Sequence, residues 1–283
     1  MQRSLFPVFI SAALVIAGYA ALVQFLPFKV QKGQNQFDTN MLRAQDYLGR
    51  PEADTVMAGS SLTFRLPPPV LGPHIANLAI AGGSPATGIT LIERSGARPR
   101  LVLVEVNLLS RGTDAATLQS LLRFPERQLR ESVRAFRTGY DPVNLAERVI
   151  QALLHKADED LVPQPDAIRK LIADQRQAMS SPPDAVSLNR NLAQIASLVS
   201  TLQARGVRVG FFELPIDPNL MDLAGEKELR RAVMERFPPD HFCWLKLSVP
   251  GGAHTIDGLH LMTADAVLVA TQVVEQRRAC LKS

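Results

Sequence analysis

Two short segments, far apart in the chain, carry side chains that together can do nucleophilic chemistry. Ser61 follows Gly59 and Ser60, while Asp257 and His260 lie three residues apart near the C-terminus. A serine hydroxyl becomes a nucleophile when a histidine takes its proton and a carboxylate orients the histidine ring. The sequence therefore predicts Ser61 as a nucleophile, His260 as its base and Asp257 as the orienting acid.

The position of Ser61 follows from the apolar run before it. Residues 55–58 are typical of a buried parallel strand, and Gly59 would end that strand. Ser61 would then lie at a strand-to-helix turn, where a hydroxyl is exposed and the first helix amides can face a developing negative charge. Asp257 and His260 would lie on a loop before the final helix and reach back across the sheet.

Apolar runs alternate with helical patterns along most of the chain, which is typical of a parallel sheet covered by helices on both faces. We expect five strands, at residues 55–58, 74–80, 101–106, 207–213 and 241–247. We expect helices between them, at residues 86–95, 187–203, 226–237 and 263–278. This pattern predicts one large α/β domain over residues 33–283.

Residues 112–186 interrupt this alternation, because they contain several helical stretches and no convincing strand. We expect a helical insertion after the third strand, at the edge of the sheet where ligands bind in open α/β folds. A lid or partner-docking element and a purely structural helical layer both fit the pattern.

One predicted helix in this interval is basic. Pro125 suits the first turn of a helix, and four arginines would then share one face opposite Leu129, Val133 and Phe136. These arginines are Arg127, Arg130, Arg134 and Arg137. Such a face can lie on anionic headgroups or an acidic polymer. A solvated face partly neutralised by Glu126 and Glu131 is the alternative.

The N-terminus contains a candidate membrane segment. Residues 4–28 carry no charge, and their apolar core at 5–26 is long enough to cross the ~30 Å hydrocarbon layer. This run exceeds the ~7–15 residues of a usual signal-peptide core, which favours an uncleaved anchor over residues 1–32. A cleaved signal peptide is the alternative, since Ala17, Ala20 and Ala21 offer small residues for cleavage. We expect the body of the protein beyond the membrane.

The charge, cysteine and histidine content of the chain bears on whether it binds nucleic acid or metal. The chain has 31 basic and 27 acidic residues without a strongly basic arm, so a nucleic-acid partner is not implied. Its two cysteines, Cys243 and Cys280, fit either one disulfide or two buried thiols. Neither they nor the five histidines have a metal-ligand spacing, so no metal or cofactor is predicted. His254 has no matching acid nearby and is expected to be a surface residue.

Three motifs in order resemble the SGNH (GDSL-like) hydrolase superfamily. They are Gly-Ser-Ser at 59–61, Asn-Leu-Ala-Ile-Ala-Gly-Gly at 77–83 and Asp-Gly-Leu-His at 257–260. The resemblance covers residues 54–262 and implies a flavodoxin-like three-layer sandwich with catalytic Ser61, Asp257 and His260. It also implies an oxyanion hole formed by the amides of Ser61 and Gly82 and an asparagine side chain, for which Asn107 is the candidate.

The chain departs from this family pattern at two places. The usual Gly-Asp-Ser has Ser60 in place of its aspartate, and the usual Gly-x-Asn-Asp after the third strand reads Glu105-Val106-Asn107-Leu108. The register of Asn107 in this block is not fixed by the sequence, because the glycine that normally precedes it is replaced by Glu105. Without Asn107 the oxyanion hole would have two donors or be completed by another group such as Ser84.

Within the superfamily, the chain is similar to exported, membrane-anchored acyl-transfer proteins, namely those of alginate and cellulose acetylation and of D-alanyl transfer to teichoic acids. The resemblance implies that Ser61 accepts an acyl group, usually acetyl, from a membrane-bound O-acyltransferase partner and passes it to a polysaccharide hydroxyl. It further implies a bacterial inner-membrane protein with its catalytic domain in the periplasm. An esterase or lipase of small acyl esters, and a non-catalytic scaffold of an exopolysaccharide complex, are the alternatives.

Overall fold

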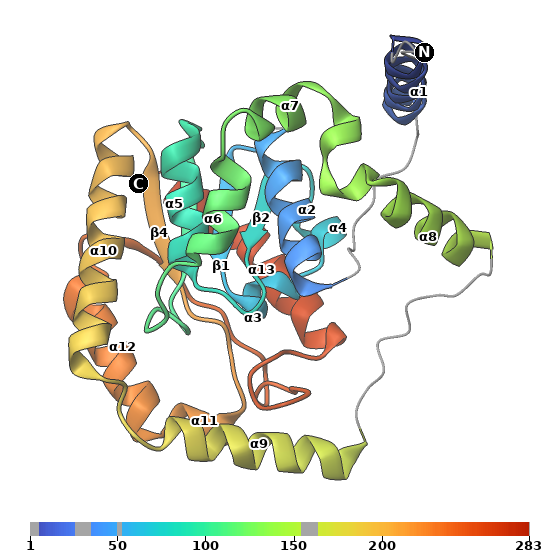
Figure 1. The fold of residues 1–283 in the computed structure, drawn as a ribbon. Helices are drawn as coiled ribbons and strands as arrows, with labels where there is room; N and C mark the ends of the chain where they lie inside the picture. The colour runs from blue at the N-terminus through green and yellow to red at the C-terminus, as the bar shows by residue number, and fades with distance from the viewer. Residues whose placement is uncertain (1–5, 26–34, 50–52, 154–163, 283) are drawn as a thin grey trace. The chain divides into compact units, whose positions relative to one another are not determined.

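The computed structural model describes residues 6–25, 35–49, 53–153 and 164–282 (Figure 1). The chain forms two compact units. One contains residues 1–49 and 119–158, and the other contains residues 50–118 and 159–283. We call them the N-terminal unit and the sheet unit.

The sheet unit is built on five parallel strands in the order β2-β1-β3-β4-β5. The strands are β1 (Thr55–Gly59), β2 (Ile75–Ala79), β3 (Leu101–Glu105), β4 (Arg208–Phe212) and β5 (Cys243–Leu245). β2, β3, β4 and β5 lie inside the runs predicted for them, and β1 extends one residue beyond its run, to Gly59. The α/β class is confirmed. This strand order is that of flavodoxin-like, doubly wound sheets, in which ligands bind at the carboxyl ends of the strands.

The two faces of the sheet are both buried, because alternate side chains of a strand point to opposite sides. Met57 and Leu103 belong to the apolar cluster that includes Val269 of α13 (Thr263–Cys280). Ala58 points the other way, against Gly88 of α5. On that face α5 (Pro85–Ser95) lies beside α10 (Ala185–Ala204), as Figure 1 shows. This two-sided burial explains why the strands read as continuous apolar runs.

Five further helices belong to the described part of the sheet unit. They are α3 (Ser61–Phe64), α4 (Pro68–Leu71), α9 (Pro165–Met179), α11 (Pro218–Met221) and α12 (Ala224–Arg236). The bond between Cys243 and Cys280 joins β5 to α13, with 5.5 Å between their Cα atoms. Of the two states that the sequence allowed for these cysteines, the structure therefore has the disulfide.

The described residues between β3 and β4 form helices only. α6 (Ala115–Leu122) runs from the sheet unit into the N-terminal unit, which continues through α7 (Glu126–Ser132), η1 (Arg134–Phe136), η2 (Thr138–Tyr140) and α8 (Pro142–Leu153). Residues 119–158 thus form one compact unit with the start of the chain. The sequence pattern did not indicate this association.

The N-terminal unit begins with α1 (Phe6–Phe25), followed by α2 (Gln36–Leu48). Residues 7–25 of α1 are long and apolar enough to cross a membrane, a property that signal sequences share. The Tyr19 hydroxyl donates a hydrogen bond to the carbonyl of Tyr140, and Arg134 Nη1 donates to the carbonyl of Gln24 at 3.2 Å. These contacts tie the last turns of α1 to η1 and η2.

The prediction of one basic helix through Arg137 was wrong. α7 ends at Ser132, Arg134 lies in η1, and Arg137 follows η1. Arg130 donates to the carbonyl of Ser120 at 2.6 Å, and Arg137 donates to the carbonyl of Arg130 at 2.8 Å. The guanidinium groups of these residues satisfy backbone carbonyls within their own unit, so the four arginines do not form one continuous face.

Candidate functional site

Three side chains of the sheet unit form a hydrogen-bonded chain. The Nδ1 atom of His260 lies 2.6 Å from Asp257 Oδ2, and its Nε2 atom lies 2.9 Å from Ser61 Oγ. Ser61 and His260 are 199 residues apart in sequence, so the fold alone brings them together. The order of carboxylate, imidazole and hydroxyl is that of a serine nucleophile with its base and orienting acid.

The carboxylate of Asp257 is held in its ionised form. Burial opposes ionisation, but hydrogen bonds from the His260 side chain and from backbone amides outweigh it, and the pKa of Asp257 lies below its ordinary value. Asp257 Oδ1 accepts the amides of Leu259 at 3.0 Å and His260 at 2.8 Å. These bonds point Oδ2 at the imidazole and favour a proton on Nδ1, which leaves Nε2 able to accept the serine proton.

Asp257 and His260 lie on a loop that closes on itself, residues 254–262, which we call the histidine loop. Thr255 and Leu261 form an antiparallel bridge, and the Met262 amide donates to the His254 carbonyl at 2.8 Å. At the tip, Gly258 has a φ of 94°, a conformation that favours glycine. Its carbonyl accepts the Asp217 amide at 2.8 Å, which anchors the tip to the segment after β4.

Ser61 lies where the sequence predicted it, at the first residue of α3 directly after β1. The preceding Ser60 is the N-cap of α3, and its Oγ accepts the Leu62 amide at 3.2 Å. A short-side-chain N-cap is typical at this position because it satisfies an otherwise unpaired helix amide. We call residues 59–63 the serine turn.

A buried carboxylate that the sequence analysis did not assign holds the serine turn. Glu105, at the end of β3, is fully buried. Its Oε2 accepts the Ser60 amide at 2.8 Å, the Thr63 amide at 3.2 Å and the Thr63 hydroxyl at 2.7 Å. Its Oε1 accepts the Ser60 hydroxyl at 2.6 Å. Four hydrogen bonds thus offset the cost of burying this charge and hold both sides of Ser61.

This cluster also explains the glycine before it. A Cβ atom at Gly59 would lie 2.4 Å from the Thr63 side chain and 2.9 Å from Glu105 Oε2. Ser60 and Glu105 are, moreover, two of the positions at which the chain departs from the family pattern it resembles, and here they are hydrogen-bonded to each other. A charged residue ending the otherwise apolar strand 101–105 was the signal in the sequence, since buried charges require partners.

Gly82 lies in the turn between β2 and α5, with a φ of 71°. β1 and β2 are parallel neighbours, and the Ile80 amide donates to the Gly59 carbonyl at 2.9 Å. The turn of Gly82 and the serine turn therefore leave the same edge of the sheet. This placement agrees with the expected position of Gly82, whose role as an oxyanion donor stays a prediction.

Among the described residues, we observe no hydrogen bond from the Asn107 side chain to Ser61, Asp257 or His260. Its Nδ2 atom donates to the Leu214 carbonyl at 2.9 Å, and its Oδ1 atom accepts the Leu214 amide at 2.8 Å. The side chain is buried and connects the ends of β3 and β4. Ser84, the other candidate, caps α5 and donates to the Arg111 carbonyl at 2.8 Å. We therefore expect a smaller contribution to the oxyanion hole from either residue than its motif position implies.

The histidine loop contains a second histidine with an acid partner. His254 Nδ1 lies 3.1 Å from Asp265 Oδ2, which also accepts the His254 amide at 2.7 Å. The statement that His254 has no matching acid was wrong, because Asp265 comes from the start of α13. The His254 side chain is 70% exposed, against 23% for His260, which agrees with the surface position predicted for His254. It is His260 that contacts Ser61.

Among the residues that the structure describes, no group of three or more His, Cys, Asp or Glu side chains is arranged to hold a metal ion. Comparisons with family models, with curated proteins and with solved structures find no match to the chain. The candidate site therefore rests on its own residues and their geometry.

Proposed function

We propose that this protein is a membrane-anchored serine O-acyltransferase or esterase of the SGNH type, acting through an acyl group on Ser61. The observation that carries the proposal is the hydrogen-bonded chain from Asp257 through His260 to Ser61. Such a chain serves nucleophilic catalysis on unrelated folds, so its geometry argues for serine chemistry independently of the family.

In the proposed reaction, His260 Nε2 takes the proton of Ser61 as Oγ attacks the carbonyl carbon of an acyl ester. Amides of Ser61 and Gly82 stabilise the tetrahedral oxyanion. The bond to the leaving alcohol then breaks, and that alcohol takes the proton from His260. A second hydroxyl, from a sugar or from water, repeats these steps in reverse and releases Ser61. Only the identity of this acceptor separates transfer from hydrolysis.

The proposed location is the bacterial inner membrane, with the sheet unit on the periplasmic side. An apolar helix near the N-terminus and a disulfide in the sheet unit support this. Disulfides persist in the periplasm and are rare in the cytosol. The acceptor that we propose is a surface polysaccharide, and the proposed acyl donor is a membrane-bound O-acyltransferase, both from the resemblance alone.

Intact-mass analysis of the full chain after incubation with an activated acetyl ester tests the proposal. We expect the mass to rise by one acetyl group in the wild-type protein and to stay unchanged in Ser61→Ala. The matched control is Ser200→Ala, which removes an exposed serine hydroxyl of α10 in the same unit.

Labelling of Ser61→Ala, or absence of both adduct and released product in the wild-type protein, would refute a serine acyl-enzyme. Where the adduct forms, adding candidate glycans separates the two reactions. An acetylated glycan indicates transfer, and free acetate alone indicates hydrolysis.

A further inference from the structure

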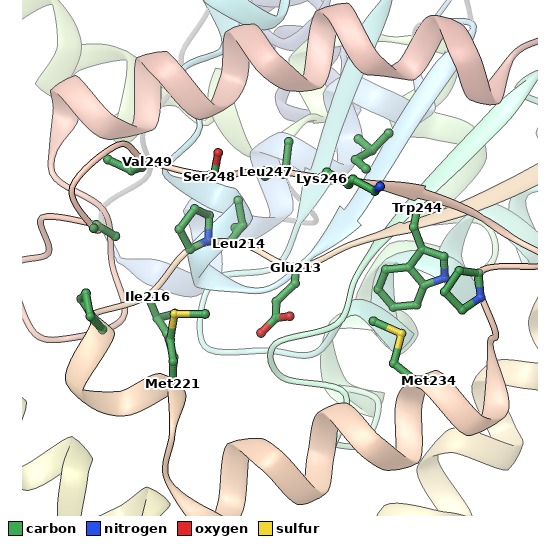
Figure 2. Close-up of a pocket in the computed structure, with 16 residues that line it drawn as sticks. Glu213, Leu214, Ile216, Met221, Met234, Trp244, Lys246, Leu247, Ser248 and Val249 are labelled. Atoms are coloured by element: carbon green, nitrogen blue, oxygen red, sulfur yellow. The ribbon is translucent and has the colours of Figure 1, made fainter.

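A cavity of about 400 Å³ lies between the ends of β4 and β5 in the sheet unit (Figure 2). The pairing of the two strands ends at Phe212 and Leu245, and the cavity is lined by the residues that follow each of them. Its volume falls within the roughly 300–1,000 Å³ that is typical of small-molecule sites. The cavity is also at the carboxyl edge of the sheet, where ligands bind in this fold class.

The two walls of the cavity are the segment after β4 and the segment after β5, and each is hydrogen-bonded to a neighbouring element outside the cavity. On one side, the Asn107 amide binds the backbone of Leu214 and so ties the end of β4 to β3. On the other side, two glutamine side chains of α13 bind the segment after β5 through both its amides and its carbonyls. These pairs are Gln276 with Lys246 and Gln272 with Ser248. The walls are therefore fixed by polar contacts outside the cavity, which keeps its interior apolar.

The lining of the cavity consists mainly of hydrocarbon and sulfur. Figure 2 shows Met221 and Met234 reaching into it from α11 and α12, with the Trp244 ring at one end. Ile216 and Val249 lie toward the other end. Methionine side chains adjust their shape to flexible apolar partners, so this lining fits a chain of methylene groups.

The one carboxylate in the lining, that of Glu213, forms an ion pair with Arg230. Both oxygens of Glu213 accept hydrogen bonds from Arg230 Nε, at 3.2 and 3.0 Å, and the Nη2 atom of Arg230 contacts Oε1. A carboxylate paired in this way does not select a cationic ligand, because its charge is balanced within the protein. The cavity thus favours a neutral apolar group over a positively charged one.

From its volume and lining, we propose that this cavity binds a linear alkyl chain. At the ~30 Å³ that a group the size of a water molecule occupies, the cavity has room for a chain of roughly 13 carbon atoms, so a ten-carbon chain fits inside it. Two sources share this chemistry: the acyl chain of an ester substrate, and a free fatty acid.

The walls of the cavity also support the histidine loop. Gly252 and Ala253 line it and lead directly into that loop. Ile216 lines it from the other side and precedes Asp217, whose amide holds the loop tip at Gly258. An alkyl chain bound here contacts both supports of the loop that carries His260. Binding itself does not depend on the reaction proposed for Ser61.

Trp244 is the only tryptophan of the chain, so its fluorescence reports on the end of this cavity that its ring lines. The experiment titrates the full chain, held in an amphipathic polymer free of detergent, with decanoate that carries a terminal bromine. Bromine quenches tryptophan on contact. The variants are Met221→Arg and Met234→Arg, and the control is Leu268→Arg, since Leu268 is 38% exposed and Met221 39%.

We expect saturable quenching that unlabelled decanoate reverses. Apparent affinity should rise about fourfold per methylene from hexanoate to decanoate, as burial of apolar surface requires. Met221→Arg and Met234→Arg should weaken binding at least about tenfold, because a charge would enter an apolar site, whereas Leu268→Arg should match the wild type. Quenching that does not saturate, or that survives in both methionine variants with wild-type unfolding midpoints, would overturn the proposal.

A second set of measurements identifies the source of the chain. If it is the substrate's acyl group, kcat/KM for nitrophenyl esters rises from acetyl to decanoyl in the wild type, and Met221→Arg removes that rise. If the chain is that of a free fatty acid, brominated decanoate still quenches Trp244, but kcat/KM does not rise with the length of the acyl group. Ser61→Ala should bind decanoate normally, so failure of the catalytic proposal and failure of this site appear in different experiments.

Discussion

The serine turn and the histidine loop meet at one hydrogen bond, but the protein holds them in different ways. The serine turn is fastened to the buried carboxylate of Glu105 by four hydrogen bonds at the centre of the sheet. The histidine loop is held by its own backbone bridge, by the bond from Asp217 to its tip and, at its first residue, by Asp265 of α13, which accepts the His254 amide. Leu259 and Leu261 of this loop are buried in the same apolar cluster as Leu62 of the serine turn, but the two residues that lead into the loop line a cavity.

This difference indicates a division between a fixed nucleophile and an adjustable base. Both segments are packed on the core, but a turn tied to a buried charge has one arrangement, while a loop that adjoins a cavity has more room to shift. In the proposed reaction the distance from Ser61 to His260 would then be set mainly by the loop. The variants below test each side of this comparison.

The largest effect is expected on the side of the histidine loop. Asp257→Asn should lower kcat about 10⁴-fold, because an amide no longer holds the imidazole tautomer whose Nε2 accepts the serine proton. The measurement is turnover of an acetyl ester beside the unfolding midpoint. Asp265→Asn, which alters the exposed His254 pair, is the matched control and should keep nearly full activity. Similar losses in both variants would argue against the assignment of His260 as the base.

The serine turn should respond to the loss of Glu105. Glu105→Ala leaves buried donors of Ser60 and Thr63 unpaired, so we expect the free energy of unfolding to fall by about 2–4 kcal/mol and kcat by about 10²-fold as Ser61 loses its position. Glu105→Gln preserves the volume and can still accept from Thr63 while donating to the Ser60 hydroxyl. It should recover most of both losses.

The activity of Glu105→Gln distinguishes two roles of Glu105, namely positioning Ser61 through hydrogen bonds and supplying a negative charge. If Glu105→Gln is as inactive as Glu105→Ala while folding normally, the negative charge of Glu105 itself takes part in the reaction. Kinetics and thermal unfolding of the two variants, measured side by side, separate these results.

Asn107 lies between the two regions and should have a smaller effect on catalysis. As an oxyanion donor it would contribute about 10²-fold to acylation, but its amide already binds the backbone of Leu214. We therefore expect Asn107→Ala to lower the acylation rate less than about tenfold and to destabilise the protein by about 1–2 kcal/mol. Pre-steady-state acylation rates provide the check. A loss near 10²-fold with an unchanged unfolding midpoint would restore the donor role.

The smallest effect on catalysis is expected at Glu226, a buried residue in the first turn of α12. Burial, and then repulsion by Glu213, raises the pKa of Glu226 to about 7, against partial opposition from Arg230. The folded protein therefore binds this proton more tightly than the unfolded chain, so the free energy of unfolding should fall as pH rises from about 4.5 to about 7. Above pH 7, Glu226→Gln should be more stable than the wild type by about 1–3 kcal/mol.

Chemical denaturation at pH 5 and pH 8 measures this difference. Glu235→Gln, at an exposed position of the same helix, is the control and should not change the pH dependence. If the free energy of unfolding changes equally between pH 5 and pH 8 in the wild type and in Glu226→Gln, Glu226 is not the titrating group.

Much of the sheet unit was predictable, because its signals are local. Buried parallel strands read as apolar runs, and long helices such as α10 and α13 show helical periodicity. The basic helix was misjudged because the spacing of Arg127 to Arg137 fits a helix, while α7 ends at Ser132 in the structure. Spacing alone does not show where a helix stops.

The sequence by itself determined the residue types of the candidate site, the alternation of strands and helices, and an apolar segment near the N-terminus. Tertiary structure decided which of these residues meet. It paired His260 rather than His254 with Ser61, placed Glu105 under the serine turn, and opened a cavity beside the histidine loop. Such contacts join residues far apart in the chain, and they depend on strand order and packing, which the pattern of any single segment does not contain.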